Sequence, residues 1–353
     1  MEEINFRLAG DTDIDKINLF YNSVYKKNRD KLEFTWEFNT APAGKAIYVV
    51  AEHNGFIIGT QCVIPYYVIT YGNTVILTGK SEDTLVSSDF RGRHIFEKMY
   101  ALLIEACRKN NITVIWGFTY AVKPFLKLGF QVPFRSKMGL LVLKPRKAAR
   151  YFASLSAKNT GLDKLKITGL SFASYIKALL LKAKAEETRN LSFEQVSLNR
   201  PDFNYLKNEG SFGLKLDTDF MDYRINKNPF SKRYTTCNYM KNGNVSITLT
   251  FNITEENVGY IIQLYVQPSV TKRELKGFTT SMIQATDLKD CSALRYWGFS
   301  HNQQNREEID WLRSCGFTFI DRGIAFVWLP LTSDPVLDPR QFVLSRMASQ
   351  GTD

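Results

Sequence analysis

The residues best suited to chemistry in this sequence lie in one stretch, VSSDFRGRHIFEKMY at positions 86–100. An Arg-Gly-Arg triplet follows an apolar segment and precedes apolar residues at helical spacing that begin at Ile95. The first amides of a helix lack an internal partner and carry roughly half a positive charge. A glycine-containing loop can direct such amides toward a phosphate. The stretch therefore predicts an anion site, and a solvated, charged turn is the alternative interpretation.

The surrounding elements alternate between helix and strand over the first 145 residues. Apolar spacing predicts a helix over 13–25, and AIYVVAEHNGFIIGTQCVI reads as two strands around the hairpin dipeptide Asn54-Gly55. A second strand pair turns at Gly72-Asn73 and leads into the Arg-Gly-Arg loop. Further on, the sequence predicts a helix over 95–109, the buried strand ITVIWGF, a short helix, and a strand over 139–143.

Two blocks of the first half recur in the same order in the second half. Pro42 is six positions after Trp36, and Pro229 is six positions after Tyr223. A basic residue and then an Asn-Gly turn follow each proline. The block IWGFTYAVKPFLKLGF likewise has a counterpart in YWGFSHNQQNREEIDWLRSCGF. A matched order of this kind indicates duplication of a whole domain. We therefore expect a domain over 1–148, a helical linker over 149–192, a second domain over 193–332, and a C-terminal tail over 333–353.

Composition limits the classes of function. The chain has 353 residues, which suggests about two domains, and a formal net charge of +11, which favours anionic partners. Five cysteines form no CxxC pair, as expected in a reducing compartment such as the cytoplasm. The polar opening MEEINFRLAGD is not typical of a signal peptide, and no apolar run approaches the roughly 20 residues that span a bilayer. Only three histidines are present, so we expect no metal site.

The layout of residues 4–145 resembles the GNAT superfamily of acyl-CoA-dependent N-acyltransferases. Its pyrophosphate loop has the pattern Arg/Gln-x-x-Gly-x-Gly/Ala after the fourth strand; here Arg91 matches the first position, but His94 and Phe96 replace the two small residues. A strand, a small helix and the sequence Lys-x-Gly-Phe then follow, as VIWGF, AVKPF and KLGF. The resemblance implies an α+β fold of two tandem GNAT-like domains, each a mixed, mostly antiparallel sheet flanked by helices, with a degenerate second copy.

The resemblance also implies acetyl-CoA, or another acyl-CoA, as a co-substrate. Its pyrophosphate would lie on the loop and helix start, and the backbone of the fourth strand would bind the pantetheine arm and polarise the thioester carbonyl. The residues implied in cofactor binding are Leu85, Val86, Arg91, Gly92, Arg93, His94, Ile95, Phe96 and Phe125. Cofactor binding at this loop requires that His94 have ordinary helical angles and a ring that points away from the pyrophosphate. The reason is that His94 adds a Cβ and a ring where the family pattern has glycine.

Two carboxylates and one tyrosine are the implied catalytic groups. A carboxylate near the fourth strand often accepts the amine's proton in this family, and Glu82 and Asp83 are the local candidates. In an extended segment Glu82 shares a face with Val86, and Asp83 shares one with Leu85; which of the two is the base stays open. Phe125 occupies the position of the tyrosine that often protonates the leaving thiolate. Tyr120 or water could replace it.

The implied function is transfer of an acetyl or other short acyl group from acyl-CoA to an amine by direct attack. A small-molecule or amino-sugar acceptor is the first expectation, a protein lysine is possible, and nucleic acid is not expected. The second half offers Lys272 and Arg273 at the equivalent loop but no Arg-Gly, so a second pyrophosphate site is not predicted. Two alternatives stay open: a non-catalytic acyl-CoA or nucleotide-binding protein, and a Fem-type aminoacyl transferase.

Overall fold

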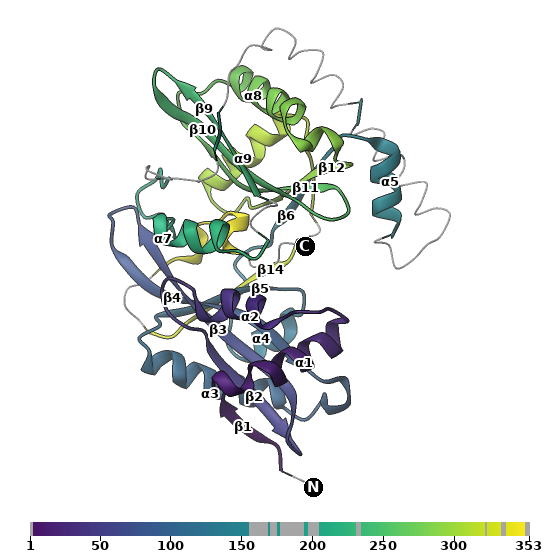
Figure 1. Ribbon diagram of the computed structural model, residues 1–353. Helices are drawn as coiled ribbons and strands as arrows, with labels where there is room; N and C mark the ends of the chain where they lie inside the picture. Colours follow the sequence, from purple (N-terminus) through teal and green to yellow (C-terminus); the bar gives the residue numbers. More distant parts are fainter. Residues whose placement is uncertain are drawn as a thin grey trace. The chain divides into compact units, whose positions relative to one another are not determined.

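The computed structural model describes residues 3–154, 169, 175–176, 194–196, 205–230, 234–321, 323–332 and 337–349. The chain forms two compact units, each assembled from three segments of sequence (Figure 1). Unit 1 comprises Met1–Arg135, Leu206–Pro229 and Ile324–Phe342. Unit 2 comprises Ser136–Tyr205, Phe230–Gly323 and Val343–Asp353. Most of the predicted helices within 149–192 lie outside the described residues.

The sheet of unit 1 has the strand order β1-β2-β3-β4-β5-β14, and β8 joins it at β3. Only the β4–β5 pair on this path is parallel; the other neighbours are antiparallel. The strands are β1 (Asn5–Leu8), β2 (Ile47–His53), β3 (Phe56–Thr70), β4 (Val75–Val86), β5 (Val114–Thr119), β8 (Phe212–Leu214) and β14 (Ala325–Pro330), and β15 (Phe342–Val343) pairs with β8.

The helices of unit 1 follow the apolar spacing read from the sequence. Helix α3 begins and ends where the sequence predicts, and its buried stripe of Ile95, Met99 and Leu103 belongs to the core of the sheet. The helical segments are α1 (Ile14–Tyr25), α2 (Lys31–Phe34), α3 (Ile95–Lys109), α4 (Val122–Lys127) and α7 (Thr218–Met221), the 3-10 turns η1 (Asp11–Asp13), η3 (Ser88–Phe90) and η8 (Pro339–Gln341), and the π-helical segments η2 (Thr35–Asn39) and η5 (Asp222–Asn226).

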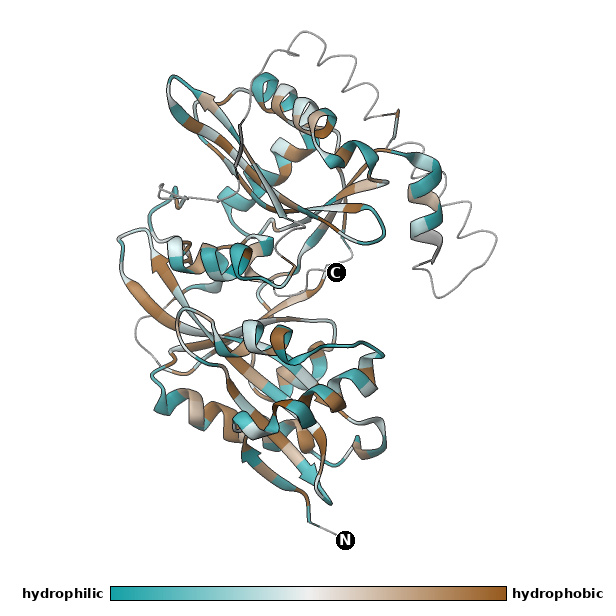
Figure 2. Cartoon of the chain, viewed as in Figure 1, coloured by the Kyte–Doolittle hydropathy of each residue, from teal (hydrophilic) through white to brown (hydrophobic). Residues whose placement is uncertain are grey.

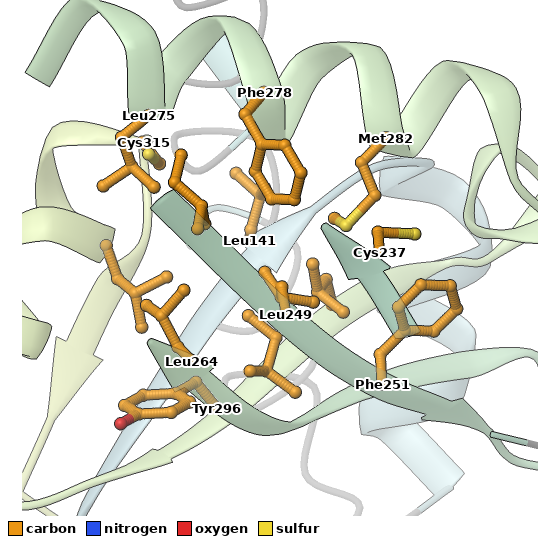
Figure 3. Packing of buried hydrophobic residues seen from close by; sticks show 14 of the residues in the cluster. Leu141, Cys237, Leu249, Phe251, Leu264, Leu275, Phe278, Met282, Tyr296 and Cys315 are labelled. Atoms are coloured by element: carbon orange, nitrogen blue, oxygen red, sulfur yellow. The ribbon is translucent and has the colours of Figure 1, made fainter. Parts of the chain in front are cut away.

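Unit 2 repeats the plan with the strand order β13-β6-β12-β11-β10-β9-β7 and one parallel pair, β11–β12. Leu275, Phe278 and Met282 of helix α8 pack on this sheet (Figure 3), and apolar residues likewise concentrate on the strands in Figure 2. The elements are α5 (Pro145–Ser154), β6 (Lys137–Val142), β7 (Glu194–Val196), β9 (Tyr234–Lys241), β10 (Asn244–Ile253), β11 (Val258–Val266), α8 (Lys272–Ala285), η7 (Asp287–Asp290), β12 (Ala293–Gly298), α9 (Gln303–Ser314), β13 (Thr318–Ile320) and η9 (Arg346–Ala348).

The two sheets exchange strands. Strand β6 comes from the first half of the sequence but pairs with β12 and β13 in unit 2, whereas β14 comes from the second half and pairs with β5 in unit 1. The units therefore differ from the contiguous ranges 1–148 and 193–332. Part of the C-terminal segment 333–353 also enters a sheet, through β15. Hydrophobic periodicity identifies a strand without identifying its partner, so sequence pattern alone predicts each strand but not the exchange.

The first of the two repeated blocks has the same local structure in both copies. Asp30 caps α2, which continues into the π-helical segment η2; Asp217 caps α7, which continues into η5. Each aspartate accepts a hydrogen bond from the backbone amide three residues later. Both copies belong to unit 1, so the second copy has contributed its capped segment to the sheet of the first.

Candidate active site

The Arg-Gly-Arg loop and the residue after it include two residues, on either side of Arg93, in the left-handed backbone region. Gly92 has φ of +80° and His94 has φ of +57°, and α3 begins at the next residue, Ile95. The expectation of ordinary helical angles at His94 is wrong. A left-handed backbone is the one that glycine adopts at no steric cost, so His94 has a conformation that favours glycine at this position. Its side chain is 78% exposed, with Nδ1 3.7 Å from Glu97 Oε1, so the ring lies in solvent.

The amides at the start of α3 are uncapped. His94 makes no side-chain capping bond, and no hydrogen bond from the backbone amides of residues 92–97 occurs within the described parts of the chain. Helix α8, the counterpart in unit 2, has a capping box in which Glu274 and Thr271 bond each other's amides. These bonds lower the pKa of Glu274 to about 2. The start of α8 is thus bonded by the protein's own carboxylate, whereas the start of α3 has no such bond within the described residues.

Strands β4 and β5 separate beside the loop. Their parallel pairing covers only Gly79 to Ser81 against Ile115 to Gly117. Beyond this point Leu85 and Val86 remain paired with β3 on their other side, opposite Thr60 and Gly59. Toward β5, Leu85 and Val86 have no strand partner among the described residues, and their assignment to the pantetheine arm stays a prediction.

Five residues of the predicted cofactor set are buried or pack against the core, and Leu85 and Val86 are two of them. Ile95 and Phe125 are buried, and Phe96 is partly buried against the same cluster. The Phe96 ring centroid lies 5.4 Å from that of Phe125 and 4.8 Å from that of Tyr100. Arg91 and Arg93 are exposed beside the loop, with the Arg93 guanidinium 5.0 Å from the ring of Phe90.

A β-bulge at Asp83 changes the faces predicted for the two carboxylates. Cys62 of β3 pairs with Glu82 and Thr60 with Leu85, so one residue of β3 faces two of β4. Asp83 has φ of +50° and accepts a bond from Thr60 Oγ1 at its carbonyl. Because of the extra residue, Glu82 shares a face with Leu85. The expectation that it shares one with Val86 is wrong, since it assumed a regular strand.

The carboxylate of Asp83 is held by two neighbours. Its side chain is 4% exposed and lies 3.0 Å from Arg29 Nη2, and the hydroxyl of Tyr48 donates to the same oxygen. Burial, followed by the charge of Asp83, raises the pKa of Tyr48 well above its usual value. Arg29 is itself fixed by the side-chain oxygen of Asn18 at 2.7 Å. Asp83 therefore secures the bulge and the segment before α2.

Glu82 is the more accessible carboxylate. Its side chain is 29% exposed and forms an ion pair with Lys80, which is 1% exposed. Tyr120, the candidate acid, lies at the end of β5 and is 76% exposed. The structure thus separates the three candidates: Asp83 is enclosed, Glu82 is partly open, and Tyr120 faces solvent.

Four residues near these carboxylates were not predicted from the sequence. They are Arg29, Glu37, Tyr48 and Lys80. Lys80 lies two residues from Glu82, a spacing that places both on one face of a strand, so the sequence carried a signal for it. The others come from separate elements, and only the fold brings them together.

A surface cavity of about 520 Å³ lies between the two capped segments, lined by Leu32, Thr35, Trp36, Thr40, Pro42, Asp219, Asp222, Tyr223 and Lys227. Eight of these residues form four pairs that are equivalent in the repeat: Leu32 and Asp219, Thr35 and Asp222, Trp36 and Tyr223, Thr40 and Lys227. Over the described residues, the side chains form no group of three or more potential metal ligands. No described helix has the length and apolar content needed to cross a bilayer.

Comparisons with known proteins show what this chain is similar to. Residues 5–132 match the model of the acetyltransferase (GNAT) domain. No match is found among curated protein sequences. A conserved protein of unknown function from Enterococcus faecalis V583, a probable N-acyltransferase, superposes with a TM-score of 0.62 at 10% identity, over 94% of this chain and 73% of that one.

Two further solved structures have the same architecture. A tandem GNAT protein from the clavulanic acid biosynthesis pathway gives a TM-score of 0.55 at 11% identity, over 94% of this chain and 99% of that one. Saccharomyces cerevisiae N-myristoyltransferase with bound myristoyl-CoA gives 0.57 at 12% identity, over 94% and 79%. These likenesses confirm the predicted fold class of two mixed sheets flanked by helices. Residues 5–132 thus match a GNAT domain, and the chain has the fold of a tandem GNAT protein.

Proposed function

We propose that this protein transfers a short acyl group, acetyl in the first instance, from acyl-CoA to the amine of a small molecule. The single observation that carries the proposal is the uncapped start of α3 beside the separated strands β4 and β5. The contrast with α8 supports it, because the equivalent amides of unit 2 are bonded to the protein's own carboxylate. The loop residues 91–96 would hold the pyrophosphate, with Arg91 and Arg93 adding charge.

Acyl-CoA supplies the activated acyl group. The amide of Ser87 donates to Ile58 of β3, so by strand alternation the amide of Val86 points away from β3. We assign to the Val86 amide the role of orienting the pantetheine arm and polarising the thioester carbonyl. Ile95, Phe96 and Phe125 would support the loop from the core rather than bind the ligand through their side chains.

Glu82 is the proposed general base. The amine nitrogen forms a bond to the thioester carbon, the carbon–sulfur bond breaks with its electrons on sulfur, and Glu82 accepts the proton that the nitrogen loses. Asp83 is less suited to this role because its side chain is 4% exposed and Arg29 and Tyr48 both bind its Oδ2. A thiol with a pKa of about 8.5 can leave without an acid, so the exposed Tyr120 need not protonate it.

Isothermal titration of the full chain with acetyl-CoA tests the binding step, and thiol release over a library of amines tests turnover. Alanine at both Arg91 and Arg93 should weaken binding, whereas alanine at Arg108, in the last turn of the same helix, should not. Failure of both wild type and variants to bind would reject the proposal. Binding without turnover over the whole library would favour the non-catalytic alternative.

A further inference from the structure

The surface cavity between the two capped segments has one neutral wall and one charged wall. All of its lining residues belong to unit 1, and its volume of about 520 Å³ lies in the range of pockets that hold small molecules. The wall from the first copy of the repeat carries no charge at Leu32, Thr35 and Thr40. The equivalent positions of the second copy are Asp219, Asp222 and Lys227.

The two most buried lining residues, Trp36 and Tyr223, form a fixed floor. They are 6% and 2% exposed, and their rings stack with centroids 5.8 Å apart. Trp36 Nε1 donates to the carbonyl of Tyr223 at 2.8 Å, and the Tyr223 hydroxyl donates to the carbonyl of Glu37 at 3.0 Å. Arg224 contacts the Trp36 ring at 5.8 Å, but it is completely buried and does not line the cavity. The protein's own contacts therefore hold the floor in place.

One carboxylate of the charged wall is left for a ligand. Asp222 pairs with Lys227 at 2.7 Å, and this hydrogen bond lowers the pKa of Asp222 and raises that of Lys227. Lys215, the other lysine near Asp219, pairs with Asp217 at 2.7 Å. Over the described residues, Asp219 makes no side-chain hydrogen bond or ion pair and acts on both lysines only through its charge. The lining thus has one negative charge in excess.

The capped segment folds without these two carboxylates. The capping residue is a different aspartate in each copy, Asp30 or Asp217. The first copy forms the same capped, π-helical structure with leucine and threonine at the positions of Asp219 and Asp222. The charge of the wall is therefore not a requirement of the local fold.

The cavity is separate from the candidate acyl-transfer carboxylates. Phe34 and Phe38 of the segment α2–η2 pack on the ring of Tyr48, with centroids 5.7 and 5.5 Å away. The hydroxyl of Tyr48 donates to Asp83. Neither Asp83 nor Glu82 lines the cavity. The segment thus contacts the carboxylate side of the sheet and the cavity through different residues.

We propose that this cavity binds a small organic cation, namely an ammonium group on an apolar body. The ammonium group pairs with Asp219, and the apolar body lies against Leu32, Pro42 and the aromatic floor. Lys227 neutralises Asp222 and so limits the site to one cationic group. The inference does not rest on the proposed function, because no residue of the candidate acyl-transfer site takes part in it.

The test uses phenethylamine, a cation at neutral pH, and 2-phenylethanol as an uncharged molecule of similar shape. The nitrogen-15 signal of the Trp36 indole reports on the floor, and Trp36→Phe assigns it by its loss. The Trp116 indole, which donates to Thr78 Oγ1 at 3.0 Å in the same unit, is the reference signal. We expect a saturable shift of the Trp36 signal with phenethylamine, and about fivefold weaker binding of 2-phenylethanol.

Substitutions in and outside the cavity have opposite or no expected effects. Asp219→Asn should weaken the binding of phenethylamine about fivefold. Lys227→Gln should strengthen it, because Asp222 then lacks its partner. Asp11→Asn alters an exposed aspartate of unit 1 outside the cavity and should leave the binding unchanged. Glu82→Gln should also leave it unchanged.

Three results would overturn the inference. They are the absence of a saturable shift in the wild type, equal affinity for the amine and the alcohol, and wild-type affinity in Asp219→Asn. Loss of binding in Glu82→Gln would assign the amine to the acyl-transfer site instead and overturn it as well. If Trp36→Phe does not fold, titration calorimetry on the wild type and Asp219→Asn gives the same comparison. Absence of acetyl-CoA binding would contradict the proposed function alone.

Discussion

Trp36 and Tyr223, which occupy equivalent positions in the internal repeat, bond and stack directly on each other. The indole of Trp36 donates to the carbonyl of Tyr223 at 2.8 Å, and the two rings stack with centroids 5.8 Å apart. They are 187 residues apart in sequence, and the same offset relates their capping residues Asp30 and Asp217. The contact joins the two capped segments, which together line the surface cavity of unit 1.

Substitution of Trp36 by phenylalanine should destabilise unit 1. The change removes the donor to the buried carbonyl of Tyr223 and leaves that acceptor unpaired, which costs about 1–3 kcal/mol. Urea unfolding of wild type and variant in parallel measures the difference. Phe38→Leu, which keeps an apolar side chain in the same segment, serves as a packing comparison. An unchanged midpoint in Trp36→Phe would contradict the importance of this bond.

Substitutions of the two neighbouring carboxylates should have different effects: at Asp83 mainly on stability, and at Glu82 mainly on acyl transfer. Asp83→Asn removes one partner of a buried ion pair with Arg29, and breaking such pairs costs about 3–5 kcal/mol. Glu82→Gln alters a partly exposed carboxylate and should cost less stability while abolishing most acyl transfer. Thermal unfolding and thiol release on the same two variants provide the comparison. The assignment of the base would be reversed if Asp83→Asn kept its stability and lost turnover.

Glu37 should give the stability of the protein a distinctive pH dependence. Its pKa in the folded state, about 8, lies above the ordinary glutamate value of 4.5, so the folded state binds more protons than the unfolded state between these values. The free energy of unfolding therefore falls as pH rises through this window, by at most about 1.4 kcal/mol per pH unit. Thermal unfolding at several pH values should show this slope in wild type and a shallower one in Glu37→Gln. Equal slopes would contradict the buried, protonated carboxyl.

Position 94 should tolerate glycine and reject a β-branched residue. His94 has a left-handed backbone, which glycine adopts freely and which is a strained conformation for valine. We expect His94→Gly to preserve acetyl-CoA binding and stability, and His94→Val to lose roughly 1–2 kcal/mol or more of stability together with affinity. Titration calorimetry and thermal unfolding on both variants test this. Equal behaviour of the two variants would show that the loop does not need this backbone.

Local patterns in the sequence predicted the helices and strands. The bulge at Asp83 and the partners of its carboxylate depend on tertiary structure. Helix α3 and the Asn54-Gly55 hairpin follow from apolar spacing and turn chemistry. The bulge at Asp83 could not be predicted, because a non-glycine residue with positive φ leaves no signature in the pattern. The partners of Asp83 come from the chain before α2 and from β2, so the enclosure of one carboxylate and the exposure of the other depend on tertiary packing.

The sequence pattern did not predict the strand exchange either, although one glycine lies at the point where the exchange occurs. A Cβ at Gly323 would lie 1.5 Å from the carbonyl oxygen of Ser136, so two segments pass too closely there for any other residue. Gly323 precedes β14, and Ser136 precedes β6. The close approach therefore occurs where the chain enters both exchanged strands.

Titration of the intact protein with acetyl-CoA at low and moderate salt tests whether the loop before α3 binds the pyrophosphate of acyl-CoA. We expect one acetyl-CoA site per chain. Alanine at Arg91 and Arg93, or valine at His94, should weaken the binding of acetyl-CoA, and Glu274→Gln at the capped start of α8 should leave it unchanged. Two results would contradict a site at the α3 loop: no binding of acetyl-CoA to the wild type, or a loss of binding in Glu274→Gln when the α3 loop variants bind normally.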